Sequence, residues 1–519
     1  MTINQMNKTS IAFLLILIAA GFLLRIYHLG TPSFWADEAI SANAAAAMVN
    51  HGTPSLPSGF IYLRGILNTF FISLSFMIFG ISEFSARLPS VIFGTIMIPL
   101  VYLMGVRAGN GKIGLIAALF ITFSVVEIAW SRQARMYQQL QFFYLASLYF
   151  FHEYFNDQAG KEKSERNLNL AFTILFFIGA VLSHEFGYVL ILVFISYFLI
   201  ANFEGIKKRW MDFAVIRNII GLFIIIVFLI LFILKFMKSN GFDLISDFLA
   251  NNGIGRVEYI ETYFNILKTE FSFFFFFAIF GAILSLRKNR MSRLLLIISF
   301  IIPFYILSYY VLLPGTRYLY FIFPILLIFS AYFLDFLIDR VPTYSQHKSK
   351  KIGLSFIAIV IIPMLIAIGF SQHVFMIMPK EDFDLGVSAP QADFKKAYNY
   401  VKQNMQSNDV VIDSWPAVSL FYMGRSDYWL TSEVYGVSFG INRFLVNNAS
   451  NEIYANATVI KNVYMLKELV AKNNRGWIVL DNTAWILISP DIKEYIREEM
   501  QIEVSDGTIR VYSWGVIGV

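Results

Sequence analysis

The sequence has no cysteine among its 519 residues, and it has few charges. The missing cysteine excludes disulfides, thiolate metal ligands and cysteine nucleophiles. Charged residues make up 15% of the chain, below the roughly 25% of an ordinary soluble domain. Apolar residues take their place: 57% of the chain is hydrophobic, 17% is aromatic, and the mean hydropathy is +0.62. Because no soluble core could bury this much apolar surface, we infer an integral membrane protein.

The formal net charge of +6 does not indicate a nucleic-acid-binding protein. The basic residues stand in short clusters between apolar runs, which is the pattern of membrane topology rather than of one basic face. The first apolar run, Ile11 to Leu24, ends at Arg25, and no small-residue cleavage site follows promptly. We therefore interpret it as a retained first span.

A helix needs about 20 apolar residues to cross the hydrocarbon core of a bilayer. The candidate runs are 11–27, 61–80, 88–106, 113–131, 137–155, 169–184, 187–202, 218–237, 264–286, 294–313, 317–338 and 352–370. If 61–80 lies along the outer surface, eleven spans remain, and Lys and Arg number eighteen in the inner loops and eight in the outer loops. If that helix crossed, the bias would reverse after residue 80. We predict about eleven spans, a cytoplasmic N-terminus and an interfacial helix at 61–80, with an ordinary span there as the alternative.

The chain beyond residue 370 has a different pattern. The stretch "FKKAYNYVKQNMQSNDVVIDSW" predicts an amphipathic helix, a turn and a buried strand, and "VYMLKELVAKNNRGWIVLDN" repeats that order. Alternating helices and strands are typical of a small α/β domain. We therefore predict a polytopic α-helical membrane domain at 1–370, with a long first external loop at 28–87, and an extracytoplasmic α/β domain at 371–519.

Two adjacent carboxylates, Asp37 and Glu38, follow the first span in "SFWADEAISANAAAAM". A carboxylate at an outer membrane mouth can bind a cation, accept a proton or simply face water. The helix-prone apolar context argues against a plain solvated loop, although an acid near a helix start is also favoured by the helix dipole. The pair alone is a weak signal of function.

Arginines gather on the same predicted outer face. The turn "EIAWSRQARMYQ" carries Arg132, Arg135 and Tyr137, and "LLPGTRYLYF" carries Arg317. The guanidinium fork matches phosphate oxygens, whereas contact with lipid headgroups is the alternative. Glu127 lies one turn inside a predicted span, where an ionisable group is either functional or a partner for an arginine.

"VLSHEFGYV" places His184 and Glu185 at another predicted outer turn. This pair could ligate a divalent metal or orient an acceptor, but we favour a hydrogen-bonded interfacial pair. Tyr62, Arg64 and Arg87 complete the candidates on this face. A carboxylate pair beside several arginines suits transfer from a phosphorylated donor, because arginines neutralise the phosphate while the carboxylate takes a proton from an incoming hydroxyl.

The sequence resembles the GT-C glycosyltransferases, of the type of the protein O-mannosyltransferases and the aminoarabinose transferases that modify lipid A. The matching stretches cover about residues 12–330 in family order: "WADEA", "LPSGFIYLRGILNTFFISLSFMIFGISEFSARLPSVIFG", "IGLIAALFITFS", "WSRQARMYQ", "LSHEFGY" and "RYLYFIFP". The resemblance implies Asp37 as general base, with Glu38 beside it, and a juxtamembrane helix matching 61–80. It also implies an undecaprenyl- or dolichyl-phosphate sugar donor, with the lipid phosphate bound by arginines at the positions of Arg132, Arg135 and Arg317.

Two departures from the family pattern are visible. Aminoarabinose transferases carry a Lys-Pro-Pro stretch where this chain has Leu56-Pro57-Ser58, so a phosphate-binding lysine is missing and Arg64 is the candidate replacement. The oligosaccharyltransferase branch has a metal-binding acid cluster where this chain has "SRQARMYQ". The absence of an acid there argues against a divalent metal, and the resemblance implies no other cofactor.

The resulting expectation is an inverting transferase of the cell membrane that acts on a hydroxyl of a protein, lipid or glycan at the outer face. A flippase or transporter for a lipid-linked saccharide is the alternative, but it predicts charges along the spans and inverted repeats. A structural membrane protein would not need Asp37. The position of the external tail makes it a candidate for selecting the acceptor.

Overall fold

The computed structural model describes residues 8–156, 163–201, 258–286, 290–310, 314–345, 375, 392–431, 444–446 and 450–516. The predicted spans at 218–237 and 352–370 lie outside the described residues. The chain forms two compact units. One unit consists of Met1–Leu24, Phe93–Ile128 and Tyr137–Ile377, and the other of Arg25–Ile92, Ala129–Met136 and Met378–Val519.

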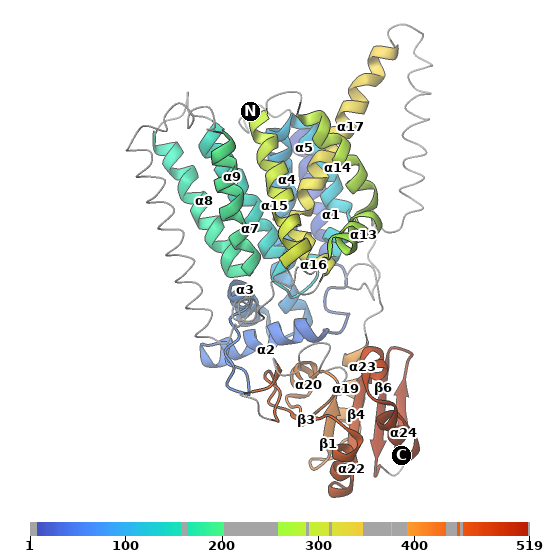
Figure 1. Ribbon diagram of the computed structural model, residues 1–519. Coiled ribbons are helices and arrows are strands. Elements are labelled where there is room, and N and C mark those ends of the chain that lie inside the picture. Colours follow the sequence, from blue (N-terminus) through green and yellow to red (C-terminus); the bar gives the residue numbers. More distant parts are fainter. Residues whose placement is uncertain are drawn as a thin grey trace. The chain divides into compact units, whose positions relative to one another are not determined.

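Apolar helices dominate the first unit (Figure 1). Its longer helices are α1 (Lys8–Ile26), α4 (Glu83–Ala108), α7 (Tyr137–Asn156), α8 (Lys163–Ser183), α15 (Arg290–Tyr310) and α17 (Phe323–Ser345), of which α1 and α4 continue into the second unit. Among the described residues, five helical runs are long and apolar enough to cross a membrane, or six if one bent pair counts as a span. The total of about eleven spans stays a prediction.

Two predicted spans are interrupted. The run 113–131 divides into α5 (Gly111–Phe123) and α6 (Val125–Trp130), because Ser124 between them adopts an extended conformation. The run 264–286 divides into α13 (Ile260–Thr269) and α14 (Ser272–Ser285), which meet at 104°. Hydropathy measures apolar content and does not register a bend in the backbone, so the sequence could not show either break.

Shorter elements and close packing complete this unit. The shorter elements are η2 (Glu185–Tyr188), α9 (Val189–Ala201), α16 (Thr316–Leu319) and η3 (Tyr320–Ile322). Helix α7 packs on α8, and α14 packs on α17. At the second contact the backbones approach so closely that a Cβ on Gly281 would lie 1.9 Å from the carbonyl oxygen of Phe329. A residue without a side chain is therefore required there.

The first external loop forms two helices of the second unit, α2 (Ala36–His51) and α3 (Ile66–Phe79), which pack against each other. Helix α2 ends at Gly52, which has the left-handed φ of 74°. Helix α3 occupies part of the predicted interfacial helix at 61–80. Its 14 residues span about 21 Å, less than the roughly 30 Å of a hydrocarbon core. This length suits a helix that does not cross.

The C-terminal region forms a six-stranded sheet with the order β3-β2-β1-β4-β6-β5 (Figure 1). The strands are β1 (Val410–Asp413), β2 (Tyr428–Leu430), β3 (Thr458–Ile460), β4 (Gly476–Asp481), β5 (Gln501–Ser505) and β6 (Ile509–Trp514). Strands β1 to β4 run parallel, and β5 and β6 form an antiparallel hairpin. The helices are α19 (Phe394–Asn404), α20 (Pro416–Met423), α22 (Val463–Lys472), α23 (Asn482–Leu487) and α24 (Pro490–Glu499).

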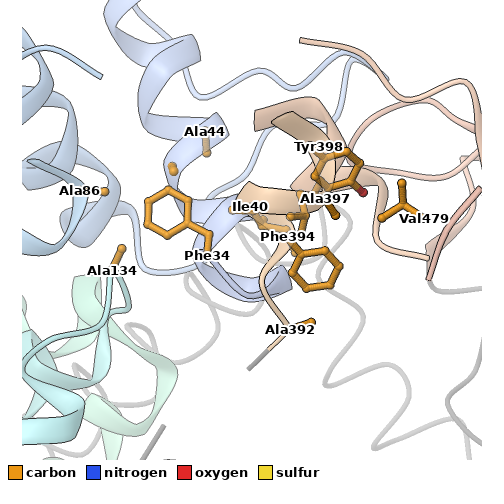
Figure 2. Packing of buried hydrophobic residues seen from close by; sticks show 14 of the residues in the cluster. Phe34, Ile40, Ala44, Ala86, Ala134, Ala392, Phe394, Ala397, Tyr398 and Val479 are labelled. Carbon is orange, nitrogen blue, oxygen red and sulfur yellow. The ribbon is translucent and has the colours of Figure 1, made fainter. Parts of the chain in front are cut away.

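The first external loop and the C-terminal region share one hydrophobic core (Figure 2). Phe34 and Ile40 lie in the same cluster as Phe394 and Tyr398 of α19. Hydrogen bonds reinforce this packing: the Phe34 N–H donates to the Tyr422 hydroxyl at 2.8 Å, and the Asn43 amide donates to the Ala417 carbonyl at 2.7 Å. The Asp37–Glu38 segment is therefore supported by the C-terminal sheet as well as by its own loop.

Candidate active site

Glu38 is fully buried and paired with Arg87. The Arg87 Nε donates to Oε1 of Glu38 at 2.8 Å and its Nη2 donates to Oε2 at 2.7 Å, a bidentate pair. The Ala134 N–H also donates to Oε1 at 2.8 Å. One carboxylate thus joins the first turn of α2, the start of α4 and the turn at 131–136.

The remaining donors of Arg87 hold the chain that precedes α2. Its guanidinium donates to the carbonyl oxygens of Leu29, Pro32 and Ser33 at 2.9–3.1 Å. It also lies 5.0 Å from the centroid of the Phe34 ring. The buried guanidinium of Arg87 therefore fixes the backbone of the segment between the first span and Asp37.

Asp37 differs sharply from its neighbour, because 31% of its side chain is exposed. Its carboxylate lies 3.4 Å from the Arg135 guanidinium. Arg135 is itself buried, and its Nη1 donates to the Asp37 carbonyl, the Ser41 hydroxyl and the Tyr62 hydroxyl at 2.9, 2.9 and 3.2 Å. Arg135 thus orients Asp37 from the inside while leaving its carboxylate accessible to a ligand.

Arg132 lies on the same turn as Arg135 and is 4% exposed. Burial, reinforced by the charge of Arg87, lowers the pKa of Arg132 to about 10. The guanidinium stays protonated at neutral pH, and its fork of donors matches the oxygens of a phosphate. Arg64 is half-buried in the segment before α3.

The remaining candidates lie in the first unit and form a cluster of rings. Tyr137 and Tyr318 both pack near the imidazole of His184, and the Arg317 guanidinium lies 5.0 Å from the Tyr318 ring. The Nδ1 of His184 accepts the N–H of Phe186 and so caps η2.

The Glu185 carboxylate lies 3.3 Å from the Nδ1 of His184. Because this Nδ1 already accepts the Phe186 N–H, it is not a donor to the carboxylate, and the hydrogen-bonded interfacial pair stays a prediction. Among the residues that the structure describes, no three His, Asp or Glu side chains gather in a group that could hold a metal ion.

Glu127 is fully buried in the first unit. Its carboxylate accepts hydrogen bonds from the Gln141 amide and the Tyr320 hydroxyl, both at 2.9 Å. The amide of Gln141 also donates to the Tyr320 carbonyl at 2.9 Å. This network connects α6 and α7 to η3. In the sequence, α6 and α7 flank the turn at 131–136, called the arginine turn below, and η3 follows Arg317.

Sequence reasoning missed two residues near Asp37. Ser41 follows Asp37 by one helical turn, and its i, i+4 spacing could have shown that both lie on one face of α2. Tyr454 of the C-terminal region packs against the rings of Phe60 and Tyr62. No local pattern shows that contact, because nearly 400 residues of chain separate the partners.

Taken together, these helices indicate a multi-pass membrane protein, and its fold is similar to that of the GT-C glycosyltransferases. Residues 64–233 match the family model of the dolichyl-phosphate-mannose-protein mannosyltransferases. The resemblance inferred from the sequence is thereby confirmed.

Solved structures show the same fold across nearly the whole chain. ArnT from Cupriavidus metallidurans, in the apo state, aligns with a TM-score of 0.63 at 14% identity and covers 98% of both chains. The same protein bound to undecaprenyl phosphate aligns equally well, over 97% of both chains at 13% identity.

The oligosaccharyltransferase AglB from Archaeoglobus fulgidus, in complex with an inhibitory peptide and a dolichol-phosphate, aligns with a TM-score of 0.58 at 13% identity. The match covers 97% of this chain and 74% of AglB. An uncharacterised protein of Aquifex aeolicus (strain VF5) is 27% identical over 399 residues, which cover 71% of this chain and 72% of that protein.

Proposed function

We propose that this protein transfers a sugar from a polyprenyl-phosphate monosaccharide to an acceptor hydroxyl at the outer face of the cell membrane. The observation that carries the proposal is the contrast within the acid pair. Glu38 is buried and accepts three hydrogen bonds, whereas the Asp37 carboxylate beside Arg135 is 31% exposed. The undecaprenyl phosphate and dolichol-phosphate bound in the aligned structures support a lipid-linked donor.

In the proposed reaction, the acceptor oxygen attacks the anomeric carbon of the donor sugar with inversion. The bond between that carbon and the phosphate oxygen breaks as the new glycosidic bond forms, and the hydroxyl proton passes to Asp37. Polyprenyl phosphate is a good leaving group and needs no general acid, only neutralisation of its charge. We assign that role to Arg132, with Arg64 and Arg317 as further candidates.

Glu38 has a positioning role in this scheme. Its pairing with Arg87 occupies both carboxylate oxygens, and the Ala134 N–H occupies Oε1 a second time. Glu38 is therefore not free to accept a proton from a substrate without breaking a buried ion pair. It holds Asp37 on α2 beside the arginine turn.

The test compares Asp37→Asn with Glu38→Gln in proteoliposomes supplied with labelled undecaprenyl-phosphate sugars and the cell-envelope fraction as acceptor. Asp37→Asn should lower the release of undecaprenyl phosphate at least about 100-fold, the low end of the contribution of a general base. It should leave undecaprenyl phosphate binding nearly unchanged. Glu38→Gln should retain measurable turnover. Near-normal turnover of Asp37→Asn would show that the base is assigned wrongly.

A flippase remains the alternative function. It would move the lipid-linked sugar across the bilayer without releasing polyprenyl phosphate. Release of polyprenyl phosphate that depends on Asp37 separates the two functions.

A further inference from the structure

The loop at 450–457 brings the C-terminal region to the edge of the Asp37 site. The ring of Tyr454 lies 6.2 Å from the Phe60 ring and 6.5 Å from the Tyr62 ring, edge to face in both cases. The Tyr62 hydroxyl accepts a hydrogen bond from Arg135, which pairs with Asp37. Tyr454 thus contacts Tyr62, and Tyr62 contacts the arginine that pairs with the proposed base.

The loop that carries Tyr454 is internally braced. Glu452 is 3% exposed, and its carboxylate accepts the backbone N–H groups of Tyr454 at 2.9 Å and Ala455 at 2.7 Å. Asn456 has a left-handed φ of 63°, which asparagine tolerates better than most residues. The Ser58 hydroxyl of the first external loop donates to the Ile453 carbonyl. These bonds fix the position of Tyr454 before any ligand arrives.

Tyr454 is only partly buried, and its hydroxyl is the group that we assign to a ligand. Within the described part of the chain it makes no hydrogen bond, and the residue is partly accessible to solvent. Burial raises the pKa of Tyr454, and the nearby Tyr62, Asp37 and Glu452 raise it further, against the opposing effect of Arg64. The phenol is therefore neutral at physiological pH and can donate a hydrogen bond.

The chemistry around this hydroxyl suits the acceptor better than the donor phosphate. Asp37 and Glu452 lie near enough to raise the pKa of this hydroxyl, whereas the nearby guanidinium of Arg64 lowers it. The partly exposed carboxylate of Asp37 disfavours an anionic phosphate beside it but accepts a neutral hydroxyl-bearing molecule. Arg132 is the better neighbour for a phosphate, because a guanidinium matches phosphate oxygens.

We propose that Tyr454 is an acceptor-binding residue, through which the C-terminal region selects a hydroxyl-bearing acceptor and directs it toward Asp37. This inference rests on the proposed function. The phenol of Tyr454 donates a hydrogen bond to the acceptor, and the rings of Phe60 and Tyr62 hold that phenol in place. Binding of the lipid-linked donor does not depend on Tyr454.

The experiment uses the full chain in proteoliposomes with labelled undecaprenyl-phosphate sugars and varies the amount of the cell-envelope fraction. Tyr454→Phe keeps the ring and removes the hydroxyl. Tyr464→Phe is the matched control, because Tyr464 lies on α22 with 74% of its surface exposed. Undecaprenyl phosphate binding to each variant is measured separately by tryptophan fluorescence.

Tyr454→Phe should raise the half-saturating amount of envelope fraction about tenfold, as expected for one lost hydrogen bond. It should leave the affinity for undecaprenyl phosphate within about twofold, and Tyr464→Phe should change neither quantity. The proposal is overturned if Tyr454→Phe behaves as Tyr464→Phe does, or if it weakens undecaprenyl phosphate binding instead.

The two proposals fail in different ways. Transfer by the wild type that is lost in Asp37→Asn supports the proposed function whatever Tyr454→Phe does. If the wild type transfers no sugar, both the function and the role of Tyr454 are refuted.

Discussion

Replacing Arg87 by leucine would test the physical basis of the site most directly. The substitution leaves the Glu38 carboxylate buried with one remaining hydrogen bond, from the Ala134 N–H. It also removes the donors to the carbonyl oxygens of Leu29, Pro32 and Ser33. Breaking a buried ion pair by removing one partner costs about 3–5 kcal/mol, because the other charge stays buried and uncompensated. We expect Arg87→Leu to lower the free energy of unfolding by at least this amount.

The double variant Arg87→Leu with Glu38→Gln separates the orphaned charge from the lost packing. A neutral amide at position 38 should recover about 2 kcal/mol of the loss, since no charge is then left buried. The control is Lys112→Ala, which removes an exposed ion pair with Asp339 and should cost less than about 1 kcal/mol.

Unfolding of each purified variant in detergent is followed by tryptophan fluorescence against denaturant concentration. The order of stability should be wild type, Lys112→Ala, the double variant and then Arg87→Leu. Equal stability of Arg87→Leu and Lys112→Ala would refute the assignment of Arg87 and Glu38 as a buried clamp. A double variant less stable than Arg87→Leu would show that the orphaned charge is not the main cost.

Four further outcomes follow from the same structure. Burial raises the pKa of Glu452 to about 7. Between the ordinary pKa of a glutamate and pH 7, the folded state therefore keeps the proton on this side chain, whereas the unfolded chain releases it. Stability should fall by about 3 kcal/mol between pH 4.5 and 7, and Glu452→Gln should remove that part of the slope in melting curves at several pH values. Arg132→Gln should weaken undecaprenyl phosphate binding about tenfold or more, measured by fluorescence titration, because a charge-assisted hydrogen bond is lost. Glu127→Ala should lower the free energy of unfolding by about 1–3 kcal/mol, since one amide hydrogen of Gln141 loses its acceptor while Tyr320 can still donate to Gln138. Glu127→Gln, which keeps an acceptor oxygen, should retain most of this stability. In the cysteine-free chain, a membrane-impermeant thiol reagent applied from outside should label Asn50→Cys but not Lys112→Cys, and the reverse result would contradict the predicted topology.

Periodic and compositional features were predictable from the sequence. The expected helix at 137–155 is α7, Tyr137–Asn156, and the expected helix and strand in "FKKAYNYVKQNMQSNDVVIDSW" are α19 and β1. These elements are readable because an apolar run or a repeating spacing is a local property. The breaks at Ser124 and before Ser272 were not predictable, because they depend on how the backbone turns within an apolar run.

The candidate site was only half predictable. Asp37 and Glu38 stand side by side in the sequence, and nothing local distinguishes them. The structure separates them, because Glu38 points to Arg87, 49 residues further on, while Asp37 meets Arg135 beside solvent. Which acid is sealed and which is accessible depends on long-range contacts.

Composition alone identified a membrane protein, because the balance of apolar and charged residues depends on no contact. Short motifs in order along the chain indicated a glycosyltransferase and singled out Asp37, since the chemistry of transfer needs particular side chains. Tertiary packing alone joined the first external loop to the C-terminal sheet in one core and placed Tyr454 beside the site. Such contacts join residues hundreds of positions apart, and only the folded chain brings them within reach of one another.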